Sequence, residues 1–478
     1  MPETADLDVL RGLFTGRLLL PGDDPAAIAP FLVDWRGRWH GAALAVAQPD
    51  TVDGVCAVMR WCHQHRVPVV PQGGNTGLSG GSVPDDTGRA LVLSLSRLNR
   101  VRQVDTVNNT LVVEAGVTLA AVQQAAAEAG RLFPLSLAAE GSCTIGGNLA
   151  TNAGGVQVLR YGNARALCLG LEVVTPEGEL WQGLHGLRKD NTGYDLRDLY
   201  IGAEGTLGII TAASLTMFPR PAGQAVALVA VDTPAAALQL LQHAQQQAAD
   251  QLTAFELMSE LCLKLVARHM PSCRMPLSTP APWFVLLEVS HPQSAALASS
   301  ALESLLEGAM EAGWVLDAAV SQSETQRQAL WALRENISEA QGAEGKTIKH
   351  DISVPISRIA AFVEATSAAV AQAFPEVRLV VFGHLGDGNL HYNVSPAEGA
   401  SGAAAAAGFL ALEAPLNALV HDAVAAAGGS ISAEHGLGVL RRDEALRYRD
   451  PVAHRLMLQV KQAFDPLGLM NPGKLLPR

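Results

Sequence analysis

The chain has 478 residues, of which 49% are hydrophobic and 17% charged, a composition that excludes a disordered or fibrous protein. With 34 Lys and Arg against 46 Asp and Glu, the formal net charge is −12, which argues against a nucleic-acid-binding protein because such proteins present a basic face. At roughly 150 residues per domain, the length predicts two or three domains.

No segment of the sequence predicts a membrane span or an export signal. The acidic N-terminus lacks the basic start and apolar core of a signal peptide. The alanine-rich stretch 402–427 is interrupted by Glu413, Asn417, His421 and Asp422, so we expect a helix of a soluble protein there. The six cysteines contain no CxxC pair and predict reduced, buried thiols. Together these features predict a cytoplasmic protein.

The first 220 residues predict a mixture of strands and helices. Apolar spacing predicts helices at 52–65 and 119–129, strands at 67–70, 90–95, 111–113 and 206–218, and a hairpin at 171–174 and 180–182. The Pro-Arg-Pro-Ala-Gly segment at 219–223 then marks a domain boundary.

After the boundary, the pattern of predicted strands and helices changes and predicts an α+β domain with a sheet covered on one side. The expected strands are 226–231, 283–289, 347–353, 378–382 and 390–394, and the expected helices are 234–249, 294–312, 325–342, 358–373, 409–427 and 452–464. We therefore expect one domain over 1–220, a second over 221–430, and a C-terminal segment, 431–478, that returns to the first.

A loop at 71–84 contains five glycines between 73 and 81. Closely spaced glycines let successive backbone N–H groups surround an anion, so pyrophosphate is the natural ligand, and a mobile surface loop is the alternative. The sequence has no GxxxxGK[ST] P-loop and no GxGxxG dinucleotide motif. Residues 77–81 do match the G-x-S-x-G nucleophile elbow of serine hydrolases, but Val-Pro-Asp-Asp follows shortly afterwards, where that elbow needs a helix.

Three further polar, glycine-rich segments occur at 134–155, 190–195 and 201–210. Each alone is compatible with a turn. Four such segments within about 140 residues favour one extended ligand that the backbone holds, and a dinucleotide bound outside the P-loop and Rossmann patterns fits this description.

The segment Phe-Gly-His-Leu-Gly-Asp-Gly-Asn-Leu-His-Tyr-Asn at 382–393 predicts a hairpin that brings His384 and His391 together. Downstream, Glu434 stands in a glycine-flanked turn. Two imidazoles and a carboxylate are a common set of ligands for a divalent metal; zinc suits them, and Mn, Co or Fe also fit. The alternative is two ordinary, partly buried histidines.

Basic residues of the second predicted domain suggest an anion pocket. Arg334 and Ser338 lie four residues apart on one predicted helix, and Lys349 points away from the apolar face of its predicted strand. An Arg fork with a Lys charge recognises a carboxylate, and solvated surface charge is the alternative.

The glycine-rich segments together resemble the FAD-binding domain of the vanillyl-alcohol oxidase / p-cresol methylhydroxylase family. The match rests on Pro-x-Gly-Gly-Asn-Thr-Gly at 71–77, Gly-Gly-Asn-x-Ala-x-Asn-Ala-Gly-Gly at 146–155 and Gly-x-Glu-Gly-Thr-Leu-Gly-Ile-Ile at 202–210, in the family's order. The resemblance implies an α+β fold class, with a two-domain FAD-binding fold and an α+β cap domain for substrate. The first loop contains no His for a covalent tether, so non-covalent FAD is expected. By this resemblance the cofactor-binding residues are Pro71, Gly73, Gly74, Asn75, Thr76, Gly77, Ser79, Ser82, Pro134, Gly141, Ser142, Thr144, Gly147, Asn152, Gly155, Glu204, Gly208, Ile210 and Asn471.

Within that family, residues 187–196 and 383–391 resemble the D-2-hydroxyglutarate dehydrogenases. The resemblance implies oxidation of a D-2-hydroxy acid with hydride transfer to the flavin. His435 would be the general base and also bind substrate with Asn393, while the distal carboxylate would lie against Arg334, Ser338 and Lys349. The family position of Ser338 is often Thr. An electron-transfer flavoprotein or a quinone would accept the electrons, and the protein is expected to be a homodimer.

Three other functions stay open from the sequence. A D-lactate or glycolate dehydrogenase of the same family would share the flavin and metal residues but needs no distal carboxylate clamp. A serine hydrolase would carry no flavin. A flavin- or metal-binding sensor would bind flavin that no hydroxy acid reduces.

Overall fold

The computed structural model describes residues 4–477, and the chain forms two compact units. The first unit comprises residues up to Gly154, Tyr161–Arg220 and the segment from Glu434 onward. The second comprises Gly155–Arg160 and Pro221–Ala433. The sequence placed divisions at 220/221 and 430/431, and no sequence signal marked 155–160 as part of the second unit.

The first unit contains a four-stranded sheet in the order β1-β2-β4-β3, formed by β1 (Gly16–Leu19), β2 (Ala45–Pro49), β3 (Val69–Gln72) and β4 (Leu91–Ser94). Strands β2, β4 and β3 are parallel, and β1 is an antiparallel edge. Because parallel strands need a crossover, α3 (Val52–His65) connects β2 to β3, and its bounds are those predicted for a helix. Thr51 caps this helix by accepting a bond from the Gly54 N–H.

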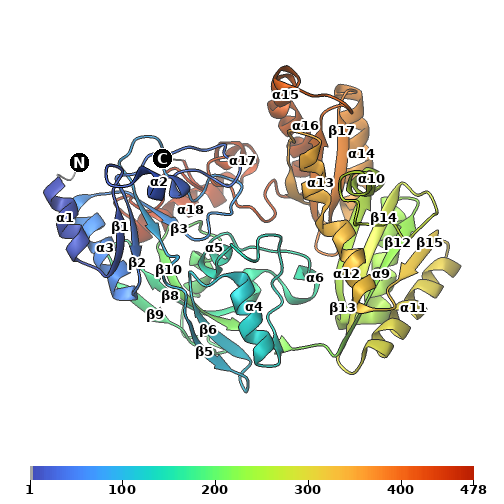
Figure 1. The fold of residues 1–478 in the computed structure, drawn as a ribbon, viewed down its shortest axis with the longest axis horizontal. Helices are drawn as coiled ribbons and strands as arrows, with labels where there is room; N and C mark the ends of the chain where they lie inside the picture. Colours follow the sequence, from blue (N-terminus) through green and yellow to red (C-terminus); the bar gives the residue numbers. More distant parts are fainter. Residues whose placement is uncertain (1–3, 478) are drawn as a thin grey trace. The chain divides into compact units, whose positions relative to one another are not determined.

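A second, antiparallel sheet in the first unit has the order β5-β6-β10-β8-β9. Its strands are β5 (Val101–Asp105), β6 (Thr110–Glu114), β8 (Cys168–Val174), β9 (Leu180–Gly183) and β10 (Ile209–Thr216). Helix α3 lies between the two sheets and contacts both β2 and β8 (Figure 1). The sequence did not predict β5 because its residues are almost all exposed and show no apolar alternation.

The C-terminal segment packs on the N-terminal sheet, as expected. After α17 (Arg442–Tyr448) and α18 (Pro451–Phe464), the chain runs beside β3, where the Val69 N–H donates to Leu469 O at 2.8 Å and the Asn471 N–H donates to Val69 O at 2.7 Å. Figure 1 shows these red elements beside the blue strands. The Met470 side chain is fully buried in the core that both sheets share.

The second unit is built on a seven-stranded antiparallel sheet in the order β15-β12-β14-β13-β17-β18-β16. The strands are β12 (Gly223–Val231), β13 (Leu252–Ser259), β14 (Trp283–His291), β15 (Asp317–Val320), β16 (Asp351–Ser353), β17 (Arg378–His384) and β18 (Asn389–Ser395). Helices α10 (Glu260–His269), α12 (Glu324–Glu335) and α13 (Ile337–Ala343) share one hydrophobic core with one face of this sheet.

The expectation of a sheet covered on one side is wrong. Helices α9 (Pro234–Ala248) and α11 (Ala295–Glu311) both contact strands β12 and β14. Helix α12 contacts the same two strands. Successive residues of a strand point to opposite faces of the sheet. Ala227 and Leu228 are successive residues of β12, and both are fully buried. Helices therefore cover both faces.

Other predictions needed correction in the second unit. Strand β13 and helix α10 were missed. The helix expected at 325–342 is divided at Asn336, which caps both α12 and α13. The strand expected at 347–353 is reduced to β16 and a single bridge between Ile348 and Val394.

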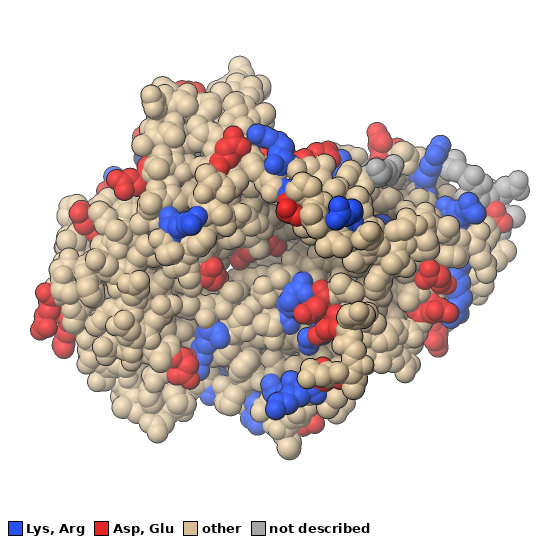
Figure 2. Space-filling model, turned by 180° about the vertical axis from the view of Figure 1, so that it is seen from behind, with Lys and Arg blue, Asp and Glu red and all other residues tan. Residues whose placement is uncertain are grey.

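Helices α15 (Ala403–Leu410) and α16 (Glu413–Ala426) occupy the alanine-rich stretch. Residues Ala403–Ala426 are long and apolar enough to cross a membrane. Core helices of soluble proteins have the same length and composition, so this is only weak evidence for a membrane span. On the face drawn in Figure 2, acidic and basic side chains of the described residues are intermixed rather than gathered by sign.

The contribution of the buried Met470 side chain to stability can be tested by shortening that side chain. We expect Met470→Ala to lower the free energy of unfolding by about 2–5 kcal/mol, because it leaves a cavity in a packed core. Leu456→Ala on α18, where the side chain is 53% exposed, is the control and should change it by less than about 0.5 kcal/mol. Urea denaturation measures both, and equal effects would contradict the packing described above.

Candidate active site

A glycine-lined cavity lies within the first unit, with about 1070 Å³ of space in and around it that no protein atom fills. Most of the residues expected to hold the cofactor line it: Pro71, Gly73, Gly74, Asn75, Thr76, Gly77, Ser79, Ser82, Thr144, Gly147, Glu204, Gly208, Ile210 and Asn471. His435 also lines it. The cavity therefore brings together the first, second and fourth of the glycine-rich segments with the returning C-terminal segment.

Five residues expected at the cofactor do not line the cavity: Pro134, Gly141, Ser142, Asn152 and Gly155. Asn152 has a structural role, because its Oδ1 accepts the Arg165 N–H at 3.0 Å. Gly155 belongs to the second unit. The sequence in turn missed Tyr200 and the backbone around Ala115, which line the cavity without any recognisable motif.

The cavity wall is built from very close backbone contacts. A Cβ atom on Gly74 would lie 2.0 Å from Ser142 O, so only glycine lets these two segments meet. Asn75, Glu204 and Asn471 all have left-handed backbone conformations, with φ of +52°, +51° and +40°. Such conformations are costly for non-glycine residues and gather at functional sites.

Glu204 ties the C-terminal segment to the cavity. Its carboxylate accepts the N–H groups of Leu437 at 2.7 Å and Gly438 at 2.8 Å. Burial raises the pKa of Glu204, and these two hydrogen bonds oppose that shift. Asn471 Nδ2 donates to Glu204 O at 2.8 Å, which fixes the same residue from the other side.

Polar atoms in the wall fit an extended polar ligand. Thr144 Oγ1 and Asn471 Oδ1 are buried and have no hydrogen-bond partner among the described residues. Buried polar atoms without partners are rare, and both of these line the cavity. The glycine-rich wall and the two unsatisfied groups fit a dinucleotide such as FAD.

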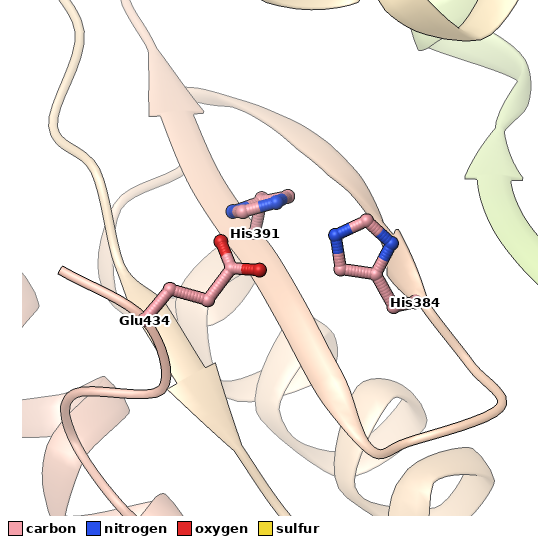
Figure 3. Close-up of side chains that lie close together, drawn as sticks. All are labelled: His384, His391 and Glu434. Carbon is pink, nitrogen blue, oxygen red and sulfur yellow. The ribbon is translucent and has the colours of Figure 1, made fainter. Parts of the chain in front are cut away.

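A second constellation comes from the β17–β18 hairpin. In Figure 3, His384 and His391 of this hairpin face the Glu434 carboxylate, and the ligand atoms of the three residues all lie within 4.8 Å of one another. Glu434 directly follows Ala433, whose N–H donates to Asp351 O at 3.2 Å. Two imidazoles and one carboxylate at this spacing fit a divalent metal ion.

A buried carboxylate that the sequence did not predict contacts His384. Glu256 of β13 accepts a hydrogen bond from His384 Nδ1 at 2.6 Å on Oε1 and from Arg334 Nε at 2.7 Å on Oε2. Burial opposes the ionisation of Glu256, but the neighbouring His384 and Arg334 outweigh it and hold the pKa of this carboxyl well below its usual value. An acidic residue inside the apolar run of residues 252–258 was the signal available in the sequence.

The remaining predicted substrate residues are placed by the register of β16 and β18. Asp351 pairs with His391, and Ile348 forms a bridge with Val394, so Lys349 and Asn393 share the sheet face of His391. Lys349 is half-buried, whereas Ile348 is buried on the opposite face, as predicted.

The neighbours of Asn393 and Arg334 are also defined. Asn393 Nδ2 donates to Gln341 Oε1 at 3.0 Å. Arg334 is 8% exposed and lies 4.8 Å from the centre of the Phe382 ring. Ser338, expected on the same helix face as Arg334, is exposed on the next helix because the helix is divided at Asn336.

The fold and the glycine-lined cavity define an FAD-binding oxidoreductase. Residues 43–183 match the model of the FAD binding domain, and residues 220–475 match that of the FAD linked oxidases, C-terminal domain. The chain belongs to the FAD-linked oxidases. The expected fold is confirmed, because p-cresol methylhydroxylase with substrate bound shares it at a TM-score of 0.74 and 15% identity, over 99% of this chain and 98% of that one.

Curated relatives are similar over the whole chain. The D-2-hydroxyglutarate dehydrogenase of Xanthomonas citri pv. viticola is 42% identical over 452 residues, which cover 95% of this chain and 93% of the relative. The mitochondrial D-2-hydroxyglutarate dehydrogenase of Bos taurus is 40% identical over 475 residues, which cover 99% of this chain and 83% of the relative.

The close contact at Gly74 predicts a loss of cofactor. We expect Gly74→Ala to weaken FAD binding by about tenfold or more, because the added methyl group collides with Ser142 O. Gly141→Ala is the matched control, since nothing lies within 4 Å of its Cβ position and Gly141 does not line the cavity. Titration of the FAD-free protein with FAD, followed by flavin fluorescence, measures both. Equal binding by both variants would contradict this account of the cavity wall.

Proposed function

We propose that this protein oxidises D-2-hydroxyglutarate to 2-oxoglutarate, with FAD as the hydride acceptor and a divalent metal ion, zinc, at His384, His391 and Glu434. The observation that carries the proposal is the adjacency of Glu434 and His435. Glu434 belongs to a group of three side chains that could hold a metal ion, and the next residue lines the glycine-rich cavity. The similarity to curated D-2-hydroxyglutarate dehydrogenases supports the choice of substrate.

FAD, when bound, supplies the acceptor for hydride, and the metal ion supplies a positive charge that favours loss of the hydroxyl proton. The residues of the chain bind and orient the substrate. His435 is the general base for the hydroxyl proton, because an imidazole can accept a proton near neutral pH. Asn393, on the sheet face of His391, is assigned to the substrate as well.

The second carboxylate of the substrate is assigned to Arg334 and Lys349. Arg334 uses Nε for Glu256, and its terminal amino groups make no hydrogen bond to another described residue. A half-buried Lys349 on the face of His391 adds a second positive charge. A second carboxylate on the substrate could form charge-assisted hydrogen bonds with Arg334 and Lys349 that lactate cannot form, which favours a dicarboxylate over lactate.

The substrate is tested by anaerobic reduction of the bound flavin. We expect D-2-hydroxyglutarate to bleach the flavin absorbance of the metal-loaded protein far faster than D-lactate does. His435→Gln should keep FAD but slow bleaching by about 10²–10⁴-fold, because it removes the base. Faster bleaching by D-lactate would contradict the substrate assignment, and unchanged bleaching by H435Q would contradict the role of His435.

The distal clamp is tested at Lys349, because truncating Arg334 would also leave Glu256 buried without its partner. Lys349→Met should raise KM for D-2-hydroxyglutarate by about 10- to 100-fold, the value of one charge-assisted hydrogen bond. It should change KM for D-lactate much less. Lys346→Met, at an exposed position of the same segment, is the control. Equal losses for both substrates would contradict the clamp.

A further inference from the structure

Glu256 lies between the proposed metal ligands and the proposed distal clamp. Its carboxylate is fully buried in the second unit, at the position of β13 that pairs with His384 of β17. Each oxygen has one partner in this set: Oε1 accepts from His384 Nδ1 at 2.6 Å, and Oε2 accepts from Arg334 Nε at 2.7 Å. One carboxylate therefore contacts both halves of the proposed substrate site.

The contact with His384 determines which ring nitrogen is available to a metal. The carboxylate of Glu256 lies against Nδ1 of His384, so Nε2 is the ring nitrogen left for a metal ion. In Figure 3, one ring nitrogen of His384 faces His391 and Glu434, and the other points away from them. A carboxylate in this position fixes both the tautomer and the ring orientation of a metal-binding histidine.

The contact with Arg334 fixes the plane of its guanidinium group. The guanidinium carbon lies 4.8 Å from the centre of the Phe382 ring, and Phe382 also packs on His391, with ring centres 4.9 Å apart. Arg334, Phe382, His391 and His384 are thus held in one packed set, with Glu256 bonded to its first and last members.

We propose that Glu256 is a positioning residue that sets both the affinity for the metal ion and the preference for a substrate with a second carboxylate. The inference rests on the proposed function, because it assumes a metal ion at His384 and a distal carboxylate at Arg334. Since one rigid carboxylate holds both groups, it fixes the distance between the two ends of the substrate. A hydroxy acid of the wrong length cannot engage both ends at once.

A purely structural role makes a different prediction. A buried ion pair adds little net stability, because desolvation of both charges offsets their attraction. If Glu256 only neutralised Arg334, its replacement would lower stability without a specific change in metal affinity. Glu288 of β14 is a suitable comparison, because it is also a buried carboxylate of the same sheet and accepts hydrogen bonds from Trp331 Nε1 and Thr253 Oγ1.

The test compares Glu256→Gln with Glu288→Gln in the FAD-loaded protein. E256Q replaces one of the two carboxylate oxygens by an NH2 group, which donates, so one of the two partners of Glu256 loses its acceptor. We expect E256Q to raise the Kd for Zn²⁺ by about 10- to 100-fold, measured by competition with a chromophoric chelator. We also expect the ratio of kcat/KM for D-2-hydroxyglutarate over D-lactate to fall by about tenfold or more. E288Q should change neither quantity.

The outcomes separate this inference from the proposed function. If the wild-type protein binds no Zn²⁺ or prefers D-lactate, the proposed function fails. If the wild type behaves as proposed but E256Q keeps its Zn²⁺ affinity and selectivity, or E288Q loses as much, the role of Glu256 is overturned. Should E256Q not accumulate as folded protein, Glu256→Asp retains the charge but moves the carboxylate. It is expected to show the same two losses, and wild-type values for both would overturn the inference.

Discussion

The antiparallel pairing of β13, β17 and β18 is the constraint on which the candidate site depends. It places Glu256 opposite His384 and Phe382 opposite His391, all on one face of the sheet. A shift of one residue in this register would turn these side chains to the other face. Gly383 makes the pairing possible at the hairpin, because a Cβ atom there would lie 2.4 Å from Asn389 O.

Two buried carboxylates organise the two units in different ways. Glu204 in the first unit binds backbone N–H groups and so holds a turn of the chain. Glu256 in the second unit binds side chains and so orients an imidazole and a guanidinium group. Burying a carboxylate costs free energy in both cases, and neither helps to form a hydrophobic core. Each carboxylate instead fixes the position of the groups that donate hydrogen bonds to it.

The parts of the site that the sequence predicted are local, and those it missed depend on distant contacts. The glycine-rich segments could be recognised because closely spaced glycines are typical of a backbone that binds an anion. The pairing of His384 with His391 could be predicted from strand alternation over a short stretch. Glu256 lies 128 residues from His384 in the chain, within a strand that was not predicted at all. Asn152 was assigned to the cofactor by resemblance; it does not line the cavity, and its Oδ1 accepts the Arg165 N–H.

The division of one helix shows the same limit at short range. Four-residue spacing placed Arg334 and Ser338 on one helix face, which holds only while the helix continues. At Asn336 it does not, and Arg334 is buried while Ser338 is exposed. The spacing of two residues in the sequence predicts which way their side chains point only if both lie in one continuous helix or strand. An assignment that spans an undetected break therefore loses its geometric basis.

Glu434 and His435 are consecutive residues, so a single peptide bond joins a ligand of the proposed metal ion to the proposed base. Within the first unit, the N–H groups of Leu437 and Gly438 donate to Glu204 and hold the turn that follows His435. Loss of the Glu204 carboxylate should therefore disturb the position of the proposed base at the cavity wall.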